Sequence, residues 1–141
     1  MAIKLLGFNF KKISVERLSS SVKEGIKTNT NINISEIKNL KQDEFKTKND
    51  LIGVEFVYSV DYSPDFAKVE LKGNLILSIE SKDSKKILKD WKDQKLDEDF
   101  KYKLFNIILK KSSLKALELE EDVNLPLHMP LFSLKNKKDS Q

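Results

Sequence analysis

Residues 54–79 read VEFVYSVDYSPDFAKVELKGNLILSI, and this stretch decides the fold class. From Val54 to Tyr62 the even positions are apolar, while odd positions carry polar residues such as Glu55 and Asp61, which is the period of a strand with one buried face. A Ser-Pro-Asp turn follows, and from Ala67 to Ile79 the alternation resumes with the apolar residues at odd positions. The stretch therefore predicts a long antiparallel hairpin whose two apolar rows share one face.

One glycine lies within this hairpin, and two weaker strand candidates precede it. Gly73 falls in the apolar row, where a missing side chain indicates a bend or the close approach of another element. Residues 3–10, extending toward Leu18, and residues 31–40 carry apolar residues with a broken phase, and a bulge near Ser35 and Glu36 would restore the second. The polar stretches 19–29 and 42–49 are expected to connect the strands, which gives four antiparallel strands in all.

The last third of the chain changes to a helical period. Asp83 or Ser84 is predicted to cap a first helix, on which Ile87, Leu88 and Trp91 share a face, so that Trp91 is at least partly buried. Strands followed by helices predict an α+β fold, in which a four-stranded antiparallel sheet precedes two C-terminal helices packed on one face.

The second predicted helix begins after Asp97 and ends before Pro126. Its apolar stripe holds Phe100, Leu104, Ile107 and Ile108. Phe105 and Leu109 lie away from this row. They therefore require a cover of their own, for which a partner subunit is the economical choice.

Composition bounds the class of protein. The chain has 141 residues, of which 39% are hydrophobic and 34% charged, as in a globular domain, and its net charge is +4 with Arg17 as the only arginine. We expect one domain over residues 1–134 and a basic tail over 135–141. Dispersed lysines with a single arginine argue against nucleic acid as a partner. The absence of cysteine, of an apolar span and of a signal sequence favours a cytoplasmic location.

The residues that carry enzyme chemistry are sparse. His128 is the single histidine and has no carboxylate or hydroxyl within three residues, so a structural or surface role is favoured. The four glycines stand apart, which leaves no phosphate cradle, and no calcium loop is present. The carboxylates at 118 and 120–122 are interpreted as a solvated helix face. We therefore expect no enzyme activity, no cofactor and no metal.

The unusual segment is residues 124–134, NLPLHMPLFSL. Its two prolines exclude a regular helix and interrupt a strand ladder, yet it is too apolar for a free tail and must dock on the domain. It either crosses the domain and completes the core or forms one wall of an apolar groove, and the two are compatible.

Several of these features together resemble a known family. Four antiparallel strands, the sequence Ile-Leu-Lys-Asp-Trp at 87–91, Asn-Ile-Ile at 106–108, Ala-Leu-Glu-Leu at 116–119 and the closing Leu-Pro-Leu-His-Met-Pro-Leu at 125–131 resemble small SecB-like proteins, chiefly archaeal ones. The resemblance covers nearly the whole chain. The bacterial export chaperones of this family are acidic where this chain is net positive, so engagement of the SecA motor does not follow from it.

The resemblance implies a chaperone that holds unfolded chains without ATP, assembles as a dimer or tetramer and binds exposed hydrophobic segments. The residues expected to bind the polypeptide are apolar ones of the sheet, the first helix and the closing segment: Phe56, Tyr58, Trp91, Leu125, Leu127, Met129, Leu131 and Phe132. The alternative is a basic adaptor for nucleic acid or another acidic partner, motivated by the excess of lysine.

Overall fold

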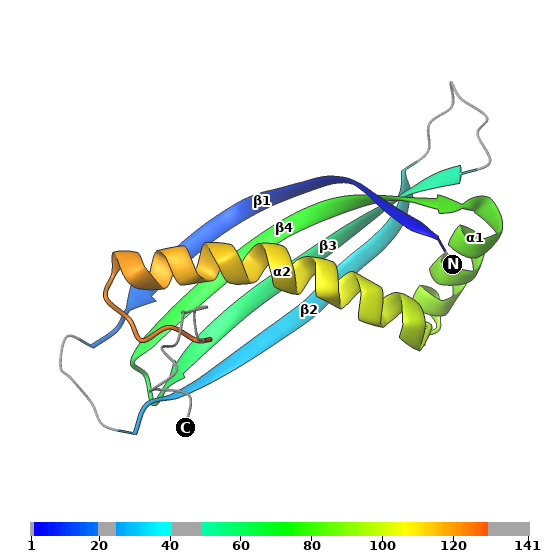
Figure 1. The fold of residues 1–141 in the computed structure, drawn as a ribbon. Coiled ribbons are helices and arrows are strands. Elements are labelled where there is room, and N and C mark those ends of the chain that lie inside the picture. Colours follow the sequence, from blue (N-terminus) through cyan, green and yellow to red (C-terminus); the bar gives the residue numbers. More distant parts are fainter. Residues whose placement is uncertain (1, 20–24, 41–48, 130–141) are drawn as a thin grey trace, which may run out of the picture.

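The computed structural model describes residues 2–19, 25–40 and 49–129, and over these residues the chain forms one four-stranded sheet and two helices. The elements follow in the predicted order: β1 (Ile3–Arg17), β2 (Lys27–Leu40), β3 (Asn49–Ser63), β4 (Ala67–Glu80), α1 (Ser81–Lys92) and α2 (Glu98–Asp122). In Figure 1, α2 runs diagonally across one face of the sheet, and α1 lies at one end of it. The predicted α+β class, with helices following an antiparallel sheet, is confirmed.

The order of the strands in the sheet is β1-β4-β3-β2, and every neighbouring pair is antiparallel. β1 and β2 are consecutive in the sequence but form opposite edges of the sheet (Figure 1). β3 and β4 are the central strands, which places the hairpin of residues 54–79 in the middle of the core.

The register of the central hairpin agrees with the prediction. Val54 lies opposite Leu75, Phe56 opposite Gly73 and Tyr58 opposite Leu71. The even residues from Val54 to Tyr62 and the odd residues from Ala67 to Ile79 are all buried. The two apolar rows therefore form one surface, which the helices cover.

Gly73 meets the close approach that its position predicted. A Cβ atom at Gly73 would collide with the backbone oxygen of Asn9 on β1 and with the ring of Phe56 on β3. The Phe56 ring lies over this gap and packs against Phe8 at a centroid distance of 5.2 Å. Gly73 thus makes room for an aromatic cluster between three strands.

Bulges explain the broken phase of the edge strands. The pairing of β2 with β3 shifts between Ile34 and Glu36, as predicted, and β1 shifts twice against β4, between Leu5 and Gly7 and between Phe10 and Lys12. The predicted strand limits were too short. β2 already begins at Lys27 and β3 at Asn49, because backbone pairing continues through residues whose side chains show no alternation.

The two helices differ in how they begin. The predicted cap of α1 is wrong: the helix starts at Ser81 after Glu80, which makes no capping bond, and Ser84 is buried and donates to the Asp50 carboxylate of β3. For α2 the predicted cap is confirmed, because Asp97 accepts a hydrogen bond of 3.1 Å from the Phe100 amide.

The core-facing side of α2 continues beyond the predicted stripe. Its buried residues are Phe100, Leu104, Ile108, Ser112, Ser113, Ala116 and Glu120. Small residues in its C-terminal half let the helix lie close to the sheet. The interpretation of Glu120 as part of a solvated face is wrong, since its exposed fraction is 0%.

Candidate functional site

An open hollow lies between the edge strand β2 and the start of α2. It has a volume of about 740 Å³. Its walls come from β2, from the end of α1, from the turn between the helices and from α2: Ile32, Asn33, Ile34, Trp91, Lys92, Gln94, Leu96, Lys101 and Phe105. Five of these side chains are apolar and the others are polar or charged, a mixture expected of a surface that binds apolar side chains.

A second hollow of about 340 Å³ continues this surface along α2. It shares Ile32, Lys101 and Phe105 with the first and adds residues of the next helical turns: Glu98, Tyr102, Asn106 and Leu109. We call the two hollows together the β2–α2 groove.

The groove exists because of where its residues lie in the fold. Ile32 and Ile34 face the helix side of the sheet, but β2 is an edge strand, so both are only half-buried. On α2, Phe105 and Leu109 lie beside the buried row and are also half-buried. The two incomplete apolar rows face each other across the groove. The prediction that Phe105 and Leu109 need a further cover is consistent with this placement.

The predicted binding residues do not form one cluster. Trp91 lines the groove and is half-buried, so its predicted partial burial is confirmed. Phe56 and Tyr58 have exposed fractions of 1% and 0%, because they point from the central strand β3 into the core beneath the helices. The expectation that these two residues offer surface to a polypeptide is wrong for this conformation.

The segment that follows α2 lies at the other end of this helix from α1, which contains Trp91 (Figure 1). Leu125 is buried, while Leu127 and Met129 are half-buried, and none of the three lines the β2–α2 groove. Leu131, Phe132 and the predicted tail over 135–141 lie outside the described residues. The predicted docking of an apolar segment is observed as far as Met129.

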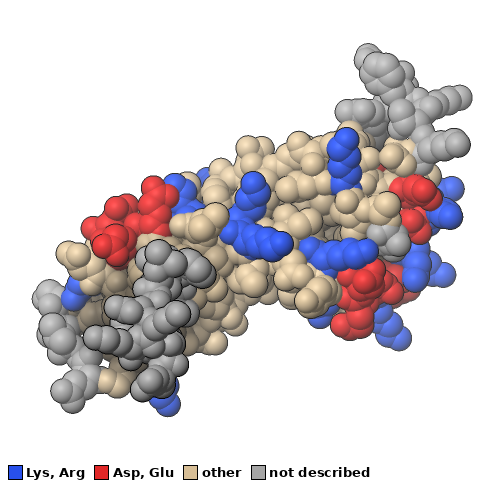
Figure 2. Space-filling model, in the orientation of Figure 1, with Lys and Arg blue, Asp and Glu red and all other residues tan. Residues whose placement is uncertain are grey.

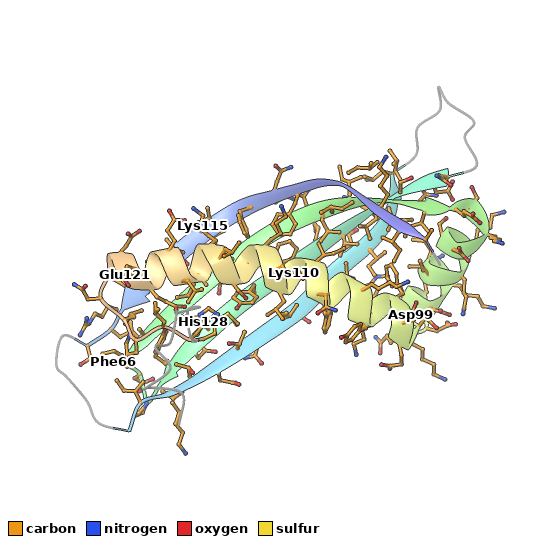
Figure 3. All side chains as sticks on the ribbon, in the orientation of Figure 1. Phe66, Asp99, Lys110, Lys115, Glu121 and His128 are labelled. Carbon is orange, nitrogen blue, oxygen red and sulfur yellow. The ribbon has the colours of Figure 1, made fainter. Side chains whose placement is uncertain are left out.

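Side chains from α2, β3 and this segment form a buried polar cluster, which we call the Glu120–His128 cluster. The Glu120 carboxylate accepts hydrogen bonds of 2.9 Å from both the backbone amide and Nδ1 of His128. On the other side of the ring, Nε2 lies 2.8 Å from the Tyr58 hydroxyl, which is also 3.2 Å from the Ser113 hydroxyl. Figure 3 places His128 between the C-terminal end of α2 and the sheet.

The cluster fixes the segment to the sheet. Tyr62 donates to the carbonyl oxygen of Pro126, and the Arg17 guanidinium donates to the carbonyls of Val123 and Asn124. Burial, and secondarily the nearby Glu120 carboxylate, raises the pKa of Tyr62 above its ordinary value, and burial is also the largest cause that raises the pKa of Tyr58.

The Glu120–His128 cluster has the order carboxylate, imidazole, hydroxyl that some hydrolases use. The side chains of His128 and Glu120 have exposed fractions of 1% and 0%. Its hydrogen bonds attach the segment to α2 and β3. Among the described residues, no three histidine or acidic side chains gather as metal ligands would.

Sequence reasoning missed most of the groove. Its signal was present in Phe105 and Leu109, which lie off the helical stripe. Ile32 and Ile34 looked like ordinary strand residues, because only the strand order makes β2 an edge. Glu120 was missed because its partner His128 lies beyond the end of the helix.

The fold is SecB-like. The structure is similar to that of a SecB-like chaperone from Mycobacterium tuberculosis, solved in complex with a ChAD peptide from the HigA1 antitoxin, with a TM-score of 0.52, 9% sequence identity, and coverage of 95% of this chain and 91% of that chain. No family model matches the sequence, and neither does any curated protein. At this identity the similarity shows the shared fold.

No helix among the described residues is long and apolar enough to span a bilayer.

Proposed function

We propose that this protein is an ATP-independent chaperone that holds exposed hydrophobic segments of unfolded polypeptides in the β2–α2 groove. The observation that carries the proposal is the groove itself: two adjoining hollows of about 740 and 340 Å³, with half-buried apolar residues on facing walls, beside a free sheet edge.

The shape of the groove supports an extended segment as the occupant. It runs from Trp91, along Ile32, to Leu109, so apolar side chains of a client could lie successively against several subsites. β2 pairs regularly with β3 from Lys27 to Ile34, before its bulge, and its outer edge faces no other strand of the described chain. A client segment could add to this edge through backbone hydrogen bonds, which are independent of sequence.

The similar fold of a chaperone solved with a bound peptide supports the same function class. Several expectations from the sequence remain proposals beside it: a cytoplasmic location, a role in protein export, and a second apolar contact surface on the closing segment, with Leu127, Met129, Leu131 and Phe132. Unchanged client protection after Met129→Ser and Phe132→Ser together, with folding intact, would remove this second surface.

Self-association is also part of the proposal. Leu6, Ile13 and Leu18, on or just after the edge strand β1, are about half exposed, at 51%, 46% and 55%. An identical chain related by a two-fold axis would cover such an edge. Sedimentation is expected to show a dimer or tetramer, and a strict monomer at all concentrations would exclude this part.

Ion pairs on the outer face of the sheet argue against the alternative of a basic adaptor. There, Lys11 lies 2.8 Å from Glu55, and Lys12 lies 2.6 Å from Glu70. Lys68 and Lys72 also lie near Glu70, so these lysines are partly neutralised locally. Nucleic-acid binding would weaken steeply with salt, and its presence at low salt would revive the alternative.

Light scattering of an aggregating client tests the proposed function and the site together. We expect the wild-type protein to suppress aggregation at equimolar concentration and Phe105→Ser to lose most of this effect, because the substitution removes the ring shared by both hollows. Leu114→Ser is the matched control, since Leu114 is on α2, is 70% exposed and does not line the groove. Equal protection by all three proteins would contradict the site, and no protection by the wild type would contradict the function.

A further inference from the structure

The larger hollow of the groove carries an uncompensated positive charge. Among the described residues, its charged lining residues are Lys92, at the end of α1, and Lys101, in the first turn of α2. Both side chains are exposed, and neither has a carboxylate within ion-pair distance among the described residues. The Lys101 ammonium lies 5.7 Å from the centroid of the Phe105 ring, so one cation stands directly beside the apolar floor.

Two acidic residues at the start of α2 have partners of their own. Asp97 caps α2 and lies 3.9 Å from Lys86, and Asp99 lies 3.2 Å from Lys103. Glu98 lines the smaller hollow together with Lys101 and is absent from the lining of the larger one. Among the described residues, the charges that line the larger hollow are therefore those of the two lysines.

We propose that Lys92 and Lys101 make the groove selective for apolar segments that carry aspartate or glutamate beside the apolar run, and unfavourable to segments flanked by lysine or arginine. This inference rests on the proposed function and adds its charge preference. The apolar floor would supply most of the affinity, and the ammonium groups would discriminate by attraction and repulsion at the rim.

A second copy of this chain is a poorer occupant on the same grounds. The middle of α2 carries the exposed Lys110 and Lys111, whereas Lys103 and Lys115 pair with carboxylates of the same helix, and Figure 2 shows lysine side chains along this surface. Docking the middle of α2 from a second copy into the groove would bring these two lysines toward Lys92 and Lys101. An acidic-flanked polypeptide brings the complementary charge.

Fluorescence anisotropy of labelled peptides tests the selectivity on the full chain. Three peptides share one apolar run and carry pairs of aspartate, serine or lysine at both ends. At low salt the acidic peptide is expected to bind on the order of ten-fold more tightly than the basic one, because each exposed charge pair contributes a few tenths to one kilocalorie. The difference should shrink at high salt, since rim charges are screened.

Charge reversal assigns the effect to the two lysines. The double variant Lys92→Glu with Lys101→Glu should prefer the basic peptide over the acidic one, and its affinity for the serine peptide measures any effect of the substitutions on the apolar contacts. Lys110→Glu is the matched control, because it makes the same change on an exposed position of α2 outside the lining, and it should keep the wild-type preference.

The outcomes separate this inference from the function on which it rests. Equal binding of the three peptides by the wild type, or an unchanged preference in the double variant, overturns the charge selectivity while leaving the groove as a binding site. Failure of the serine peptide to bind overturns both. Peptide binding that dissociates an oligomer assigns the groove to a second copy of the chain and also overturns the inference.

Discussion

The two ends of α2 lie over the same sheet, but the N-terminal end borders an open groove and the C-terminal end carries a buried polar cluster. At the N-terminal end, Phe105 and Leu109 face the edge strand β2 across an open, adaptable apolar groove. At the C-terminal end, Glu120 and His128 are sealed in a hydrogen-bonded cluster that leaves almost no exposed side-chain area. The comparison separates the part of the helix that holds the fold from the part that is free to bind.

The difference follows from what each end meets. The C-terminal half of α2 is followed by a segment that folds back and supplies His128, so its polar residue Glu120 gains partners and can be buried. The N-terminal half meets only an edge strand and the turn after α1, which leave apolar side chains half-covered. Stability therefore depends on the C-terminal turns of α2, and the proposed binding depends on its N-terminal turns.

The largest expected effect is at the sealed end. His128→Ala removes the ring that bonds Glu120 and Tyr58 and leaves the Glu120 carboxylate buried with fewer donors. Because each buried polar group that loses its hydrogen-bond partner costs about 1–3 kcal/mol, and Glu120 and Tyr58 both lose one, the free energy of unfolding should fall by about 3 kcal/mol or more. Urea denaturation of the wild type and the variant measures this loss in the free energy of unfolding.

The matched control for this variant is Glu121→Ala, one residue from Glu120 on the exposed side of the same helix turn (Figure 3). It should change stability by about 0.5 kcal/mol or less. If His128→Ala were as mild as this control, the cluster would not be what holds the segment.

A smaller loss is expected when only the hydroxyl contact is removed. Tyr58→Phe keeps the ring in the core but deprives His128 Nε2 and Ser113 of a partner, which typically costs about 1–2 kcal/mol. Tyr102→Phe, at a residue that is 70% exposed on the open groove, is the comparison and should be neutral in the same unfolding experiment. Equal effects would show that the two ends are not energetically distinct.

How much of this could be predicted from the sequence differs between the ends. Local patterns predicted the central hairpin, the bulge after Ile34 and the Asp97 cap, because each depends on residues adjacent in the chain. Long-range pairing places β1 beside β4 and makes β2 an edge strand. The hydrophobic periodicity within each strand does not predict this strand order. The groove and the burial of Glu120 both depend on such distant partners, so they could not be derived.

Alkaline pH should lower the stability that Tyr62 contributes near the C-terminal end of α2. The pKa of Tyr62 is raised, chiefly by burial, so the folded state favours the neutral phenol. The stability that the neutral Tyr62 phenol contributes is fully present below the pKa of an unfolded tyrosine, about 10. As pH rises from there toward the higher pKa of the folded state, the free energy of unfolding falls by up to about 1.4 kcal/mol per pH unit.

Unfolding of the wild type and of Tyr62→Phe, compared between pH 9 and 11, isolates this contribution. The variant is expected to be less stable at pH 9, where it lacks the bond to Pro126, but to lose stability less steeply above pH 10. Parallel curves for the two proteins would contradict the assignment.

The smallest stability change is expected in the groove. Phe105→Ser removes a half-buried ring, for which a cost of about 1 kcal/mol is expected from the area involved. The variant should therefore fold normally, as judged by circular dichroism, while client protection falls. A loss of stability as large as that of His128→Ala would mean that the groove residues serve the core and not binding.

The central claim, that the open end of α2 is the client site, is tested most directly by the fluorescence of Trp91. It is the only tryptophan in the chain, and it lines the larger hollow half-buried. A non-fluorescent apolar peptide that occupies the groove should exclude water from the indole and shift its emission to shorter wavelength, saturably and with the dissociation constant that anisotropy gives for the same peptide. Binding by anisotropy with unchanged Trp91 emission would contradict the claim and place the client elsewhere on the molecule.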